Sequence, residues 1–125
     1  MYSLGVSRSF SARHFLVGGD WGDENVEHSH RYRIELVLQA KELDRNGFLL
    51  DIVEVEQHLE AVTGRFRDKT LNELEAFKGL NPSIEQLATV MHDDFRTRLA
   101  HLPLAGLAVT VWEDDIAWTS YRLDF

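Results

Sequence analysis

The sequence contains no cysteine, only two prolines, and no stretch approaching the roughly 18 apolar residues that would indicate a transmembrane helix. The absence of cysteine excludes disulfides, thiolate metal ligands and cysteine nucleophiles. The first eight residues lack the charged and apolar regions of a signal peptide. Together these absences predict a cytoplasmic protein.

Positive charge is also scarce. Lys and Arg number 13 against 21 Asp and Glu, which gives a net charge of −8, and the basic residues form no cluster. A chain this acidic is not expected to have nucleic acid or an anionic membrane as its main partner. Its 125 residues are enough for one domain, 1–125, with a single hydrophobic core.

Histidine is the first residue type that points to chemistry. His28 and His30 are two apart at the start of a long apolar/polar alternation. On an extended strand such residues point to the same face, about 7 Å apart along the chain, and here they share that face with Tyr32 and Ile34. His28 and His30 are therefore candidate metal ligands, and they lie on the strand face that is expected to be buried.

His14 ends a similar alternation, in which it shares a face with Phe10 and Ala12. If the two strands pair antiparallel, about 4.8 Å apart, His14 can converge with His28 and His30. Three histidine nitrogens leave a tetrahedral zinc ion with one open position, which is typical of a catalytic site.

Two alternatives to zinc remain at this stage. A single histidine on an apolar face is more often a hydrogen-bonded core residue than a ligand. Iron held by two histidines and one carboxylate is the rival metal site, because Asp23, Glu24 and Glu27 lie nearby in the sequence.

The hydrophobic patterning predicts an α+β fold in which helices cover one face of an antiparallel sheet. The expected strands are 2–16, 28–40, 47–50, 107–112 and 118–123, with a glycine-rich loop at 17–23. Two helices are expected after the capping residues Asp51 and Ser83, the first running to about Phe66. We expect Glu54, Glu56 and Glu60 on its solvated face, and 67–80 as a loop with one helical turn.

Five short motifs occur in order along nearly the whole chain. They are Phe10-Ser11-Ala12-Arg13-His14; His28-Ser29-His30 followed by Tyr32; Gly47-Phe48-Leu49-Leu50-Asp51; Asn81-Pro82-Ser83-Ile84-Glu85-Gln86-Leu87-Ala88; and Val111-Trp112-Glu113 before Tyr121. This set resembles the 6-pyruvoyl-tetrahydropterin synthase family, which includes the 6-carboxy-tetrahydropterin synthases of queuosine biosynthesis.

The resemblance implies the T-fold, or tunnelling fold: a four-stranded antiparallel sheet with two helices on one side. Such sheets join edge to edge into an oligomeric barrel, so a homo-oligomer is expected, most simply a hexamer, with active sites at subunit boundaries. The resemblance also implies Zn²⁺ held by His14, His28 and His30, and a pterin held by Glu113. A carboxylate suits that role because it accepts two parallel hydrogen bonds from the ring N–H groups.

All three positions of the family's Cys/Asp/His proton-transfer set differ in this chain, and Ser29 replaces the glycine between the paired histidines. Bacterial members usually have the catalytic cysteine four residues before the first histidine of the pair, where this chain has Glu24. Glutamate occurs there in a branch that cleaves the dihydroneopterin side chain to give 6-hydroxymethyl-dihydropterin for folate synthesis. At the family's Asp-His pair, this chain has Arg67 and Asp68. We therefore predict Glu24 as the catalytic acid/base, with Asp68 as the second candidate.

Three functions are compatible with these residues. The first is a zinc-dependent, lyase-like enzyme that acts on the side chain of a dihydropterin, either dihydroneopterin or its triphosphate. The second is an inactive zinc- and pterin-binding protein that serves as a carrier or sensor. The third is a zinc hydrolase that uses Glu24 on an unrelated small substrate.

Overall fold

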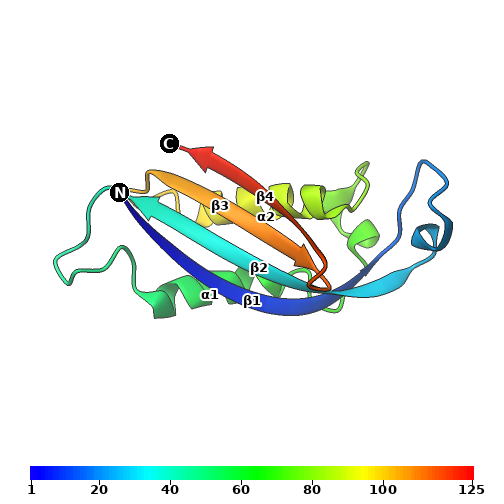
Figure 1. The fold of residues 1–125 in the computed structure, drawn as a ribbon, viewed down its shortest axis with the longest axis horizontal. Helices are drawn as coiled ribbons and strands as arrows, with labels where there is room; N and C mark the ends of the chain where they lie inside the picture. Colours follow the sequence, from blue (N-terminus) through cyan, green and yellow to red (C-terminus); the bar gives the residue numbers. More distant parts are fainter.

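The computed structural model describes residues 1–125 and has two layers, a sheet and a pair of helices (Figure 1). The strands are β1 (Tyr2–His14), β2 (His28–Ala40), β3 (Gly106–Glu113) and β4 (Ala117–Asp124), and the helices are α1 (Ile52–Thr63) and α2 (Ile84–Arg98). The strands form one antiparallel sheet in the order β1-β2-β3-β4, and both helices lie on the same face. This arrangement confirms the predicted α+β class.

The register of the sheet explains which side chains enter the core. β1 pairs with β2 from Tyr2 opposite Ala40 to His14 opposite His28. Alternate residues of β2 face the helices and are fully buried, namely Tyr32, Ile34, Leu36 and Leu38. The predicted alternation is therefore confirmed, and the histidines lie at the end of this buried face.

Both helices begin at the predicted capping residues. The Asp51 side chain accepts a hydrogen bond from the Val53 N–H, and the Ser83 side chain accepts one from the Gln86 N–H. α1 ends at Thr63 rather than at the predicted Phe66, because tight backbone turns follow Gly64. Both helices bury an apolar stripe against the sheet.

One prediction about this region was wrong. Residues 47–50 form no strand: the Asp44 carboxylate accepts the N–H groups of Asn46 and Phe48, which folds the segment into a turn. Glu60 keeps a half-exposed side chain on the predicted solvated face, where its carboxylate also pairs with the guanidinium groups of Arg8 and Arg67.

The segment between the helices pairs with the free edge of β1 at the end of that strand. The Asp68 N–H donates to the Ser11 carbonyl, and the Arg13 N–H donates to the Lys69 carbonyl, both at 2.8 Å. Two short 3-10 turns follow, at Leu71–Glu73 and Glu75–Phe77, where one helical turn was predicted. Neither helix is long and apolar enough to cross a membrane.

Candidate metal centre

The paired ends of β1 and β2 bring three imidazoles together. His14 lies directly opposite His28 in the register, and His30 is two residues further along the same face of β2. The ring centroids are 4.6 Å apart for His14 and His28, 4.9 Å for His14 and His30, and 4.7 Å for His28 and His30. The convergence predicted from strand alternation is therefore present.

Each imidazole is oriented through its Nδ1 atom. The His14 Nδ1 lies 2.7 Å from the Pro82 carbonyl oxygen, and the His28 Nδ1 lies 2.6 Å from the Val26 carbonyl oxygen. The His30 Nδ1 contacts the Asp114 carboxylate. Because a carbonyl or carboxylate oxygen accepts, each Nδ1 is the donor in these contacts, and Nε2 is the ring atom that each histidine turns toward the others; the Nε2 atoms of His28 and His30 lie 2.9 Å apart.

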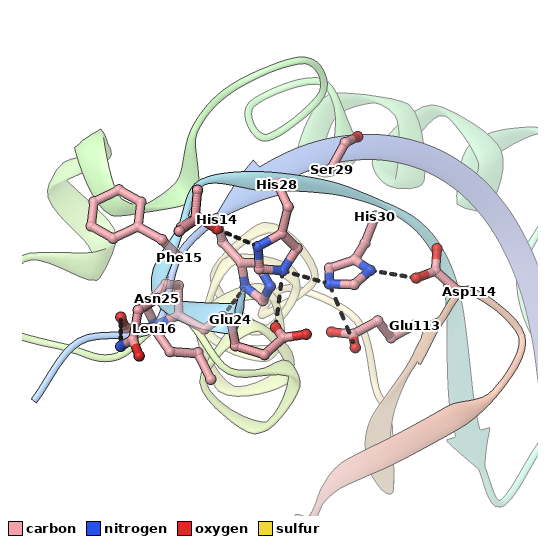
Figure 2. A network of polar contacts seen from close by, with 12 residues as sticks. His14, Phe15, Leu16, Glu24, Asn25, His28, Ser29, His30, Glu113 and Asp114 are labelled. Carbon is pink, nitrogen blue, oxygen red and sulfur yellow. Dashed lines mark hydrogen bonds and ion pairs between the residues drawn. The ribbon is translucent and has the colours of Figure 1, made fainter. Parts of the chain in front are cut away.

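The three Nε2 atoms face a common point, which Glu24 also approaches. Figure 2 shows the imidazoles turned toward one another, with Glu24 beside His28. A Glu24 carboxylate oxygen lies 3.0 Å from the His28 Nε2, and one ligand atom from each of the four residues lies within 4.8 Å of the others. The group can hold a metal ion.

The chemistry of the donors fits zinc. His14 is only 3% exposed, and its Nε2 is buried without a hydrogen-bond partner, which is costly unless a ligand fills the space. Burial lowers the pKa of His14 and favours the neutral imidazole that binds metals. Three imidazoles with oxygen acceptors on their Nδ1 atoms are a donor set that zinc commonly uses.

Glu24 lies on the loop between β1 and β2, and one side chain holds that loop closed. The Asn25 amide donates to the carbonyls of Leu16 and Gly19 at 3.0 Å and accepts the Trp21 N–H at 2.8 Å. The Leu16 N–H in turn donates to the Glu24 carbonyl at 2.8 Å. These bonds position the short 3-10 helix Gly22–Asn25, and with it Glu24, beside the histidines.

Glu113 stands on the other side of the centre, at the end of β3. It is opposite Tyr32 in the register, and its carboxylate lies 3.7 Å from the His30 Nε2. Burial raises the pKa of Glu113, with the neighbouring carboxylates of Asp114 and Glu24 acting in the same direction. Glu113 is therefore a half-buried acid beside the metal centre, within reach of a ligand bound there.

The other acids named from the sequence are placed differently. Asp68 is exposed, has a φ of 59°, and is not part of the group around the histidines. Arg67 is engaged by Glu60 at 2.8 and 3.0 Å. The Glu27 carboxylate accepts the Thr70 hydroxyl, so of the three acids considered for an iron site only Glu24 joins the histidines.

Sequence reasoning missed Asp114 and Asn25, which support the centre without entering it. Asp114 was read as part of a solvated acidic turn, yet its carboxylate accepts both the His30 Nδ1–H and the Arg31 N–H. These hydrogen bonds lower the pKa of Asp114 although burial acts against them. Extending the β2–β3 register by one residue beyond Glu113 places Asp114 opposite Arg31, the neighbour of His30.

Comparison with known proteins supplies the family. The sequence profile of 6-pyruvoyl tetrahydropterin synthase matches residues 3–124. The chain belongs to this family. No curated protein sequence gives a match. The predicted family is therefore confirmed over nearly the whole chain.

Solved structures of 6-pyruvoyl tetrahydropterin synthases share the fold. The Caenorhabditis elegans protein superposes with a TM-score of 0.86 at 22% identity, covering 98% of this chain and 96% of that chain. The Plasmodium vivax protein gives 0.81 at 15% identity, covering 99% and 98%. The Plasmodium falciparum protein gives 0.76 at 12% identity, covering 98% and 99%. The predicted T-fold is confirmed.

Proposed function

We propose that this protein is a zinc-dependent lyase that acts on the side chain of a dihydropterin, with Glu24 as its acid/base. The observation that carries the proposal is the position of the Glu24 carboxylate, 3.0 Å from a ligand nitrogen of a three-histidine centre. A base must lie close to the proton it takes, and the proposal is supported by Glu24 being the loop acid that groups with the three histidines.

In this proposal, His14, His28 and His30 hold Zn²⁺ through their Nε2 atoms. When bound, zinc polarises an oxygen of the pterin side chain and makes a neighbouring proton easier to remove. Glu113 accepts hydrogen bonds from the amino-pyrimidine edge of the pterin and so orients the side chain toward Glu24. Glu24 takes the proton and later returns it to the product.

The use of glutamate as the acid/base has support outside this chain. The Plasmodium vivax synthase has been solved in two variants in which a catalytic glutamate is replaced by alanine or by cysteine. A glutamate is therefore a catalytic residue in one protein of this fold. This chain has no cysteine at all, which leaves Glu24 as the candidate on its loop and Asp68 as a second candidate elsewhere.

The test is turnover of dihydroneopterin and its triphosphate by zinc-loaded protein, with pterin binding measured on the same samples. Glu24→Gln keeps the shape of the side chain but cannot accept a proton, so we expect kcat to fall by at least about 100-fold while pterin affinity is retained. Asp23→Asn is the matched control, since Asp23 is exposed and lies outside the group, and it should leave dihydroneopterin turnover unchanged.

Other outcomes separate the alternatives. Tight pterin binding without turnover by the unaltered protein would favour a carrier or sensor. Full activity in Glu24→Gln with loss in Asp68→Asn would move the acid/base role to Asp68. Unchanged pterin affinity in Glu113→Ala would remove Glu113 as the anchor.

A further inference from the structure

Residues 68–72, between the two helices, form a second partner for the end of β1. Arg13 and Thr70 are bridged as in a parallel sheet. On the other edge of the strand, the pairing with β2 ends at His14 opposite His28. The end of β1 that carries a metal ligand is therefore held on both edges.

The Asn72 side chain extends this contact beyond the last paired residue of β1. Its amide oxygen accepts the Phe15 N–H at 3.0 Å, and its amide N–H donates to the Phe15 carbonyl at 2.8 Å. The residues on both sides of His14, Arg13 and Phe15, are thus bound to the same segment. The position of the His14 backbone therefore depends on the position of that segment.

The Thr70 hydroxyl links the segment to both strands that carry histidines. It accepts the Arg13 Nε–H at 3.3 Å and donates to the Glu27 carboxylate at 2.8 Å. Arg13 directly precedes His14, and Glu27 directly precedes His28. One hydroxyl therefore joins the neighbours of two metal ligands that come from different strands.

The segment is itself fixed to the helix layer. Arg67 pairs with Glu60 of α1 at 2.8 and 3.0 Å, and Phe66 and Leu71 are buried in the core. Thr70 is only 6% exposed, so its hydroxyl is costly unless it is hydrogen-bonded. Because the segment is anchored in this way, it can hold the two strand ends in one relative position.

We propose that Thr70 is a positioning residue for the metal centre, whose hydroxyl fixes the placement of His14 relative to His28. The inference rests on the zinc ligation in the proposed function and adds a residue outside the group that can hold the metal. Imidazoles on separate strands bind one ion tightly only if they already converge, because ordering them on binding lowers the affinity. Loss of the Thr70 hydroxyl therefore weakens zinc binding without removing a ligand.

The first test removes the hydroxyl and keeps the shape of the side chain. Thr70→Val loses both hydrogen bonds, and we expect the zinc affinity of the full-length protein, measured by competition with a chelator, to fall about tenfold. Thr70→Ser keeps the hydroxyl and should restore most of that affinity. Thr63→Val is the matched control, because the Thr63 hydroxyl is also buried and donates one bond at 2.8 Å, to the Leu59 carbonyl within α1.

Cobalt-loaded protein separates positioning from stability. The visible absorption of Co²⁺ depends on the geometry of its ligands, so Thr70→Val should change that spectrum. Thr63→Val should leave the spectrum unaltered, whatever its effect on the unfolding free energy. Equal losses of zinc affinity in Thr70→Val and Thr63→Val would overturn the inference, as would an unaltered affinity and spectrum in Thr70→Val.

Glu27 gives an independent test from an exposed position, which does not require the core to tolerate Thr70→Val. Glu27→Ala removes the acceptor of the Thr70 hydroxyl, whereas Glu27→Gln removes the charge and keeps an acceptor oxygen. We expect the larger loss of zinc affinity in Glu27→Ala. Equal losses in the two variants would assign the effect to charge and overturn the inference.

Failure of the proposed function gives a different pattern. If the unaltered protein binds neither zinc nor cobalt, the metal centre and the positioning role fall together. If it binds zinc but turns over no pterin, the lyase proposal fails, while the affinities of Thr70→Val and Glu27→Ala still decide the role of Thr70.

Discussion

His14 and His92 are both buried histidines with one satisfied ring nitrogen, yet they belong to different kinds of site. His14 is 3% exposed and bonds the Pro82 carbonyl, and His92 is 0% exposed and bonds the Leu107 carbonyl at 3.0 Å. In each, the other ring nitrogen is buried without a partner. Burial and an unpaired nitrogen therefore do not by themselves identify a metal ligand.

The surroundings of the free nitrogen make the difference. The ring of His14 faces the rings of His28 and His30, and Glu24 joins the same group. His92 has the Tyr121 ring as its aromatic neighbour, at a centroid distance of 4.8 Å. The comparison teaches that convergence of several ligand atoms marks the metal centre, whereas His92 ties α2 to β3 within the core.

The largest expected effect is loss of metal binding. His14→Gln removes one of three imidazole ligands, and we expect zinc affinity, measured by competition with a chelator, to fall by more than about 100-fold. His92→Gln should leave zinc affinity within about twofold of the unaltered protein. A similar loss in both variants would mean that His14 acts through the fold rather than as a ligand.

The next effect concerns the residue that orients His30. Asp114→Asn places an amide N–H₂ against either the His30 Nδ1–H or the Arg31 N–H, and we expect zinc affinity to fall about 10- to 100-fold. Asp115→Asn is the matched control because both residues have positive φ, 50° and 57°, in the same turn. Equal affinities of the two variants would show that the Asp114 contact does not support the metal ligand.

A smaller effect is expected on catalysis through the loop that carries Glu24. Asn25→Asp keeps the side-chain oxygen that accepts the Trp21 N–H. It loses the amide N–H groups that donate to the carbonyls of Leu16 and Gly19 and so hold the loop closed. We expect kcat for dihydroneopterin to fall roughly tenfold, with zinc affinity nearly unchanged. Asn46→Asp, in an exposed turn, is the control, and a parallel fall in zinc affinity would argue for general loop damage.

The smallest effect is on stability in acid. Burial lowers the pKa of His92, so below about pH 6.5 the unfolded chain takes up a proton that the folded protein does not bind. The unfolding free energy of zinc-free protein should fall on the order of 1 kcal/mol between about pH 7 and pH 5.5, and by less in His92→Gln. Urea titrations of both proteins at the two pH values measure these free energies. An equal fall in the unaltered protein and in His92→Gln would exclude His92 as a contributor.

Strand alternation made much of the fold and the three histidines predictable. The side chains of His14, His28 and His30 follow the period of two that buries Phe10, Tyr32 and Ile34, and this period is a local property of the sequence. Capping by Asp51 and Ser83 was equally local, because the acceptor and the N–H groups are only two or three residues apart.

Contacts between distant segments were not predictable in the same way. The missed turn at residues 44–48 is a different case, because its contacts are local: Leu49 and Leu50 suggested a strand, but the Asp44 carboxylate accepts the N–H groups of residues two and four positions further on. Asp114 meets His30 only because β3 pairs with β2 and the turn after it has left-handed backbone. The position of Asp114 depends on how β2 and β3 pair, and that pairing is not set by the residues near Asp114 in the sequence.

The hydrogen bonds that orient the ligands also set an order of assembly. Glu24, His28 and His30 lie close together in the sequence, but the Pro82 carbonyl that orients His14 is 68 residues from it, and Asp114 is 84 residues from His30. Contacts of such long sequence separation form late, after the loop-closure entropy of the intervening chain has been overcome. The protein should therefore bind zinc with full affinity only after α2 and the β3–β4 hairpin have packed in place. Tight zinc binding would then indicate that folding is complete.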